Sequence, residues 1–151
     1  MSKLRNERLV TQSLLDRLAD TEEWPATRNS SMRMYRDGIK RDVEWLLNSR
    51  KPHMEALEQY PAACGSVFNY GLPDLTHLRG RDGNSVLMAV LKALRTYEPR
   101  IRNPRVHLVR QDDLSRSIRF HIDGQMVLED SEEEISFDTV LEMVSGGYEV
   151  K

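Results

Sequence analysis

The sequence predicts a single α+β domain in which N-terminal helices are followed by a small, mostly antiparallel sheet. Apolar residues recur at helical spacing as far as residue 97, whereas from about Arg105 onward they alternate with polar residues at a period of two. Helices that come first and strands that come after them are typical of the α+β class. A chain of 151 residues is long enough to bury one hydrophobic core.

Residues 1–29 are predicted to form an N-terminal helical arm and linker, and residues 30–151 the main domain. The arm holds a short helix within residues 7–19, which is marked by the spacing of Leu14, Leu15 and Leu18. A second helix runs to about Arg50, and Ser30 or Ser31 can cap its first turn. The core stripe of this second helix is expected at Tyr35, Ile39, Val43, Leu46 and Leu47.

The middle of the chain combines a loop with a further helix. Another helical turn or two is expected around Met54 and Leu57. The loop from Tyr60 to Leu75 is interrupted by proline and glycine but is rich in apolar side chains, so we expect it to pack across the core. Turn and cap residues at 82–85 then begin a helix from about Ser85 to Tyr97. Its buried stripe is expected at Leu87, Val90, Leu91 and Leu94.

Strand patterns occupy the rest of the chain. Ile118, Phe120 and Ile122 alternate with polar residues and indicate a half-buried strand, and a less regular alternation surrounds Val106 and Leu108. The same pattern recurs at Ile135, Phe137, Thr139, Leu141 and Met143. A turn at residues 145–147 is expected to lead into a last short strand at 148–150.

Charge is distributed unevenly along the chain. Residues 1–110 hold 19 Lys and Arg against 13 Asp and Glu, whereas residues 111–151 hold 3 against 11. The default interpretation is two solvated faces of one domain, and the functional one is a subunit that docks different partners at its two ends. Arginines between residues 95 and 110 could contact nucleic acid, but no recognised binding module surrounds them and the pI is near 6.1. We therefore expect no nucleic-acid partner.

Composition also indicates the compartment and argues against a metal centre. No run approaches the ~20 apolar residues that a membrane-spanning helix needs, and no apolar segment follows the basic N-terminus. The single cysteine, Cys64, excludes an internal disulfide and fits a reducing compartment. The four histidines show no ligand spacing, so no metal site or other cofactor is expected. These features predict a cytoplasmic protein without membrane insertion.

Glu98, Pro99 and Arg100 stand where the helical pattern gives way to strands. Proline lacks a backbone donor and pushes the preceding residue out of the helical region, so Glu98 is expected to end the helix. The two charged side chains could pair with each other, hold the corner onto the fold, or reach a partner. From the residues alone, the fold-internal and partner-binding roles are about equally supported. Under either role Arg100→Lys should not be silent, because lysine cannot make a planar bidentate contact.

Carboxylates supply the one enzymatic alternative. A glycoside hydrolase needs two of them across the scissile bond. Glu98 could be one, with Asp112 or Asp113 as the second, but nothing in the sequence places either pair at the required separation. We therefore assign no catalytic residue.

Four segments, in this order, resemble the TssE family of baseplate subunits of type VI secretion systems. They are the helix at residues 41–50, the loop at residues 66–75 with Phe68 where leucine is usual, Glu98-Pro99-Arg100 followed by Asn103-Pro104-Arg105-Val106, and a glycine before a final strand. The third segment is shared with the sheath-initiator wedge proteins of contractile phage baseplates. The resemblance covers about residues 30–151.

This resemblance implies a non-enzymatic structural subunit of a cytoplasmic baseplate that is docked at the inner membrane. Partner binding would fall to Glu98, Pro99, Arg100 and Arg105. The implied partners are the wedge proteins TssF and TssG, with TssK as a further candidate, and the sheath subunits TssB and TssC. Sheath strands would add to the edge of the sheet by β-augmentation. A lysozyme-like peptidoglycan hydrolase and a free-standing binding module are the alternatives.

Overall fold

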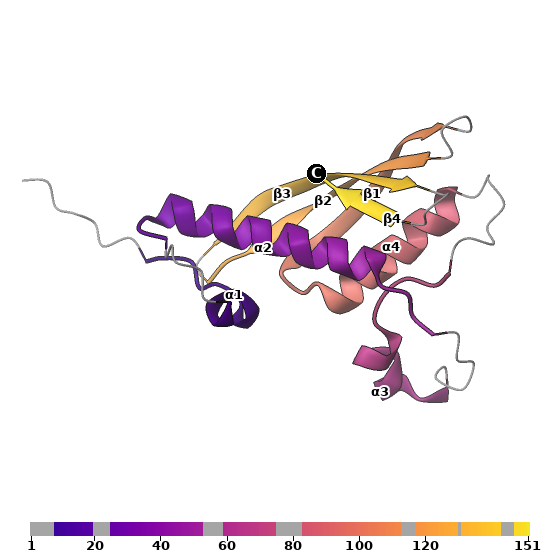
Figure 1. Ribbon diagram of the computed structural model, residues 1–151, viewed down its shortest axis with the longest axis horizontal. Coiled ribbons are helices and arrows are strands. Elements are labelled where there is room, and N and C mark those ends of the chain that lie inside the picture. Colours follow the sequence, from indigo (N-terminus) through magenta and orange to yellow (C-terminus); the bar gives the residue numbers. More distant parts are fainter. Residues whose placement is uncertain are drawn as a thin grey trace, which may run out of the picture.

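Two long helices lie across one face of a four-stranded antiparallel sheet (Figure 1). The computed structural model describes residues 8–19, 25–52, 59–74, 83–112, 117–129, 131–142 and 147–151. The helices are α2 (Arg28–Asn48) and α4 (Gly83–Tyr97), and the strands, in spatial as well as chain order, are β1 (Ile101–Asp112), β2 (Ser117–Val127), β3 (Glu132–Glu142) and β4 (Gly147–Val150). α4 packs against β1, and α2 packs against β4. The predicted α+β class is confirmed.

α2 is capped by Thr27, so the prediction of Ser30 or Ser31 as the cap was wrong. The N–H of Ser30 donates to the Thr27 hydroxyl at 3.2 Å, and the N–H of Thr27 donates to the Ser30 hydroxyl at 3.1 Å. This reciprocal capping box satisfies two helix-end donors. Ser31 is buried instead, and its hydroxyl accepts the N–H of Val10 at 3.0 Å. The expected core stripe is confirmed, with Tyr35 half-buried and four residues buried: Ile39, Val43, Leu46 and Leu47.

α4 begins at Gly83, before the expected Ser85, and ends at Tyr97 ahead of Pro99 as predicted. Its buried stripe is rotated from the expected one. Val90 and Leu94 are buried as expected, but Leu87 and Leu91 are only half-buried. The other buried apolar positions are Val86 and Ala93. The face that α4 buries is therefore shifted toward Val86 and Ala93.

The strand pattern of β2 is confirmed, but β1 starts four residues earlier than the alternation suggests. The register shifts between Arg102 and Arg105, and Asn103 adopts a positive φ of 50°. A bulge of this kind interrupts the period of two, which hides the start of the strand from pattern analysis. Gly124 lies opposite, where an added Cβ would be 2.4 Å from the Ile101 side chain. Glycine at 124 therefore lets Ile101 enter the core.

Two stretches of the sheet carry no further strand on one side within the described residues. β1 is hydrogen-bonded to β2 alone, which makes it an edge strand. β4 pairs with β3 only at residues 139–142. Asp138 extends this pairing by exchanging backbone hydrogen bonds with Lys151 at 2.7 and 3.2 Å. Residues 132–137 of β3 therefore form a second edge, which continues beyond β4.

Three short elements lie on the side of α2 away from the sheet: α1 (Leu14–Leu18), α3 (Pro61–Cys64) and the 3₁₀ turn η2 (Val67–Asn69) (Figure 1). The loop around η2 was expected to pack across the core, and for half of its apolar side chains this was wrong. Leu72 is fully buried and Tyr70 is half-buried, but Val67 is 80% exposed and Phe68 69%. Residues 60–69 fold onto themselves as α3 and η2, so that only the residues after them reach the core.

None of the helices that the structure describes is long and apolar enough to cross a membrane. The turns expected around Met54 and Leu57, and the end of the third strand pattern at Met143, lie outside the described residues. The last strand is present as predicted and begins at Gly147.

Gly71 lies where the loop around η2 meets the end of α2, and the need for its backbone conformation can be tested directly. Its φ is 106°, and an added Cβ would lie 2.5 Å from the Ser49 carbonyl oxygen. We expect Gly71→Ala to lower the free energy of unfolding by about 2 kcal/mol or more, because it adds a clash to left-handed strain. Urea denaturation measures this loss.

The matched control is Gly65→Ala, where an added Cβ meets nothing within 4 Å and φ is −96°. That change should stay within about 0.5 kcal/mol of the wild type. Equal losses for the two variants would show that the Gly71 conformation is not required.

Candidate functional site

The candidate site is the corner at which α4 ends and β1 begins. The N–H of Glu98 closes the helix by donating to Leu94 O at 2.9 Å, and the N–H of Ile101 donates to Glu98 O at 3.1 Å. The N–H of Val127 then donates to Arg100 O at 2.8 Å, which ties the corner to the end of β2. Glu98 is only 4% exposed, whereas Pro99 between the two charged residues is exposed.

The Arg100 guanidinium binds the Glu98 carboxylate with both arms of its fork. Nε and Nη2 donate to the two Glu98 carboxylate oxygens, each at 2.7 Å. Nη2 also donates to Asp42 Oδ2 on α2 at 2.7 Å. Such bidentate, charge-assisted bonds are the strongest that side chains make and need a planar guanidinium. Arg100 therefore holds the corner onto α2, which is one of the two roles left open by the sequence.

The ion pairs continue across α2 to α1. Arg41 Nε and Nη2 donate to Asp42 Oδ1 at 3.2 and 3.1 Å, and Arg41 Nη1 donates to Asp16 Oδ1 at 2.6 Å. Gly38 leaves room for Asp16, whose Oδ2 would lie 3.0 Å from an added Cβ. We call these five residues the corner cluster: Asp16, Arg41, Asp42, Glu98 and Arg100.

In the corner cluster, burial and ion pairing shift the pKa values of Arg100 and Asp16 in opposite directions. The contributions of ion pairing and hydrogen bonding together are the larger. Burial lowers the pKa of Arg100, but the hydrogen bonds and charge of Glu98, then those of Asp42, raise it well above its usual range. Burial raises the pKa of Asp16, but hydrogen bonds from Arg41 and Ser13 outweigh it and leave that pKa lowered. Burial also raises the pKa of Tyr35, whose ring lies 5.9 Å from the Arg100 guanidinium carbon. Arg100 and Asp16 therefore keep their charges at neutral pH.

Arg105 is placed apart from this cluster. It is exposed on β1 after the bulge, opposite Asp123 of β2. It lines a polar groove of about 600 Å³ with Asp123, Gln125 and Glu134. Among the described residues, Arg105 makes no hydrogen bond or ion pair with Glu98 or Arg100. The structure thus brings two of the four predicted partner-binding residues into contact and leaves Pro99 and Arg105 exposed.

For the hydrolase alternative, the carboxylate that the described structure brings beside Glu98 is that of Asp42, and both are bound by the same Arg100 guanidinium. The Glu98 carboxylate is buried and accepts three N–H bonds from Arg100. Asp113 lies outside the described residues, and Asp112 is described only in its backbone. Among the residues that the structure describes, no group of three or more His, Cys, Asp or Glu is placed to hold a metal ion.

Pattern analysis missed one polar group on the sheet face away from the helices. His121 Nδ1 lies 2.7 Å from Asp138 Oδ1, and its Nε2 lies 3.0 Å from Asp123 Oδ1. His107 is directly opposite His121 in the register and lies 3.8 Å from Asp123. The alternation placed both histidines on the polar face, but only the strand register shows which carboxylates they meet.

Comparison with known protein families gave a match over much of the chain. Residues 33–131, from α2 to the turn after β2, match the family described as baseplate wedge protein gp25. The chain belongs to this family. The match confirms the resemblance seen in the sequence, since TssE is the type VI secretion homologue of gp25. Searches of curated proteins and of solved structures gave no match.

Membership of the gp25 family gives the chain a structural role in a baseplate and implies contact with other baseplate proteins. The matched region contains the corner, Arg105 and the loop around η2. Asp16, which closes the corner cluster on α1, lies before it. The part of the chain that matches the family therefore includes most of α2 and the corner that Arg100 holds against α2.

The structural role of Arg100 predicts a large loss on truncation. Arg100→Ala would leave the buried Glu98 carboxylate without its cation, so we expect a loss of about 3 kcal/mol or more in the free energy of unfolding. Arg100→Lys should fall between this value and the wild type, because a point charge replaces the fork. Chemical denaturation measures both.

Arg102→Ala is the control, because Arg102 is 57% exposed in its side chain and pairs with the exposed Glu132. Exposed pairs contribute up to about 1 kcal/mol, so this variant should remain near the wild type. If Arg100→Ala were equally mild, the corner cluster would not hold the fold.

His121 predicts a pH dependence of stability. Its hydrogen bond to Asp138 is the largest effect and raises its pKa above the usual value. Burial lowers this pKa by less, and the nearby charge of Asp123 raises it further. A raised pKa means that the folded state binds the proton more tightly than the unfolded state. The contribution is therefore fully present below about pH 6.5 and is lost as pH rises through the folded-state value.

Urea midpoints from pH 5 to pH 9 should show the wild type losing its advantage over His121→Gln as pH rises. An advantage over His121→Gln that is independent of pH would contradict this account.

Proposed function

We propose that this gp25-family chain is the TssE-type subunit of a type VI secretion baseplate, working in the cytoplasm on a baseplate docked at the inner membrane, without enzymatic activity. The observation that carries the proposal is the family match over residues 33–131 together with the TssE-like segments at residues 41–50 and 66–75. Its role is to dock on the wedge core formed by TssF and TssG, with TssK as a further candidate partner, and to initiate assembly of the TssB–TssC sheath.

Docking on TssF and TssG is assigned to the corner and Arg105, with different tasks for the four residues. Glu98 and Arg100 fix the angle of the corner through their own ion pair and Asp42. Pro99 and Arg105 are exposed, so they are available to a partner. A rigid corner loses little conformational freedom on docking, which favours affinity.

Sheath initiation is assigned to strand addition, and the two open edges differ in how well they suit it. The β1 edge contains Pro104, which has no N–H to donate, the positive φ of Asn103 and two register shifts. Such features hinder pairing with an added strand. Residues 132–137 of β3, in contrast, pair with β2 in unbroken register. We therefore place the added strand on this part of β3.

The backbone geometry of β3 supports this assignment. Asp138 directs its N–H and C=O toward Lys151, away from β2. Because successive residues of an antiparallel strand bond alternately to either side, Ser136 and Glu134 direct theirs the same way. Beyond the end of β4 no described strand pairs with these groups, which leaves them for an incoming strand in the proposed β-augmentation.

Ser136→Pro tests this assignment, because it removes an outward N–H and leaves the β2–β3 hydrogen bonds in place. Tagged chain would be co-expressed with TssF, TssG, TssB and TssC from the same organism. We expect the wild type to recover TssF–TssG and to support sheath assembly, seen as TssB–TssC polymers by electron microscopy. Ser136→Pro should still recover TssF–TssG but assemble little sheath.

Ser136→Thr, which keeps the N–H at this exposed position, is the matched control and should assemble sheath normally. Circular dichroism checks that each variant is folded, and Glu134→Pro repeats the test on the next outward N–H. Full sheath assembly by both proline variants would exclude this edge. Failure of the wild type to recover TssF or TssG would instead favour the free-standing binding module.

A further inference from the structure

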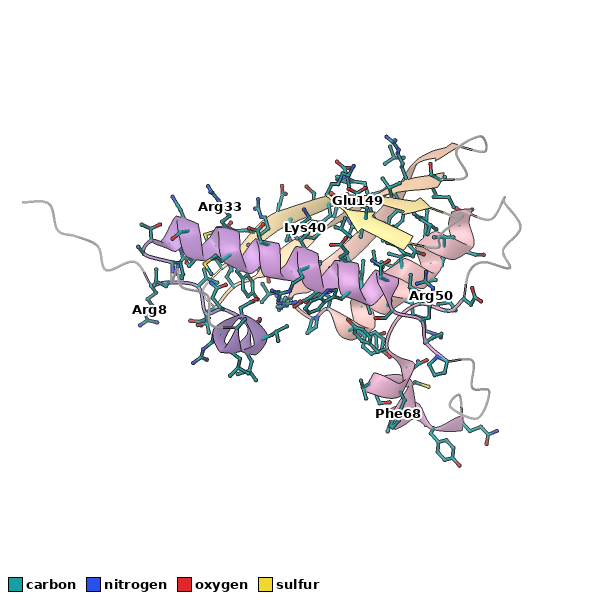
Figure 2. All side chains as sticks on the ribbon, viewed as in Figure 1. Arg8, Arg33, Lys40, Arg50, Phe68 and Glu149 are labelled. Carbon is teal, nitrogen blue, oxygen red and sulfur yellow. The ribbon has the colours of Figure 1, made fainter. Side chains whose placement is uncertain are left out.

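Residues 59–72 form a lobe that exposes apolar side chains and contains no charged residue. Charged residues make up 30% of the sequence, yet residues 59–73 contain no Asp, Glu, Lys, Arg or His. Within the lobe, Val67 is 80% exposed and Phe68 69%, and Tyr60 near its start is 63% exposed. Figure 2 shows Phe68 on the lobe, away from α2 and the sheet. We call Val67 and Phe68 the apolar knob.

Hydrogen bonds and packing hold the lobe in one conformation. The Tyr97 hydroxyl donates to the carbonyls of Cys64 and Ser66 at 3.2 and 3.3 Å. The Asn69 amide donates to the same Cys64 carbonyl at 2.8 Å. Tyr70 packs edge-to-face on Tyr97 with ring centroids 5.2 Å apart. The lobe thus presents Phe68 from a fixed backbone instead of a loose loop.

The base of the lobe is anchored to the core. Leu72 is fully buried, and its N–H donates to Ser49 O at 2.9 Å. The N–H of Lys51 donates back to Leu72 O at 3.0 Å. A large aromatic side chain that is exposed on a fixed backbone and flanked in sequence by uncharged residues has the properties of an interface hot spot, since the centres of interfaces are depleted of charge and preorganised.

We propose that the apolar knob inserts into a concave, uncharged, apolar pocket on a neighbouring baseplate protein. This inference rests on the proposed function. The charge pattern selects the occupant: a pocket lined with charged groups would leave them desolvated against Val67 and Phe68 with nothing to pair with. A lobe without Lys or Arg also lacks the attraction to anionic headgroups that membrane-binding segments use.

The position of the lobe indicates that knob and corner meet the same partner. Tyr97, which holds the lobe, is the last residue of α4 and directly precedes Glu98. The lobe and the exposed Pro99 are therefore linked through two consecutive residues. A single partner that spans Tyr97 would therefore reach both the corner and the lobe.

The test measures binding of the full chain to the purified TssF–TssG complex by biolayer interferometry. Phe68→Ser should weaken binding at least tenfold, because a hot-spot side chain is lost from the pocket. Met88→Ser on α4 is the matched control, since Met88 is 65% exposed. It should change the dissociation constant less than twofold. Both variants should keep the wild-type thermal unfolding midpoint, because neither side chain belongs to the core.

Photo-crosslinking identifies the occupant. With p-benzoylphenylalanine in place of Phe68, illumination of the complex should give a crosslink to TssF or TssG that is missing when position 88 carries the probe. If the wild type binds TssF–TssG and Phe68→Ser binds with the same dissociation constant, the inference about the apolar knob is wrong. The proposed function is not affected by that result. A crosslink to a second copy of the chain, or knob-dependent sedimentation with phosphatidylglycerol vesicles, overturns the assigned occupant. No wild-type binding at all overturns the proposed function, and the inference falls with it.

Discussion

The pairing of Arg100 with Glu98 and Asp42 is the constraint on which the arrangement of helices and sheet depends. A carboxylate that is only 4% exposed is stable in the fold only if a cation accompanies it, and Arg100 supplies that cation from two residues away. The same guanidinium reaches Asp42, so the end of α4, the start of β1 and the middle of α2 are fixed by one group. Arg41 then carries the chain of ion pairs to Asp16 on α1. Elements far apart in the sequence are thus positioned by a single charged network.

This network explains how a small domain can offer several surfaces at once. The sheet edge on β3, the exposed Pro99 and the lobe around η2 all belong to elements that the corner cluster or its neighbours hold in place. Tyr97 holds the lobe, Glu98 enters the cluster, and Ile101 begins the sheet, all within five consecutive residues. In a baseplate subunit, such a rigid junction keeps the surfaces that it carries at fixed angles to one another.

The sequence predicted those parts of the fold whose periods are undisturbed, and it failed where a period is broken or where contacts are long-range. The stripe of α2 and the alternation of β2 were read correctly because each side chain faces one environment. The start of β1 was missed because Asn103 and the register shift interrupt the alternation. The exposed Val67 and Phe68 were assigned to the core because hydrophobicity alone does not distinguish a core from an interface. The bond between Arg100 and Asp42 joins residues 58 apart, and no local pattern could have indicated it.

The distribution of charge between the corner and the lobe follows from the cost of desolvation. A charged corner that had to be stripped of water on docking would lose much of its binding free energy to that step. Here Glu98 and Arg100 are already desolvated against each other within the fold, so a partner that covers the corner displaces water mainly from Pro99. The lobe has no charged groups to desolvate, and burial of its side chains is favourable at about 25 cal/mol per Å² of apolar surface. In this domain the charged residues of the motif therefore give the surface its shape, and uncharged residues beside them are suited to give it affinity.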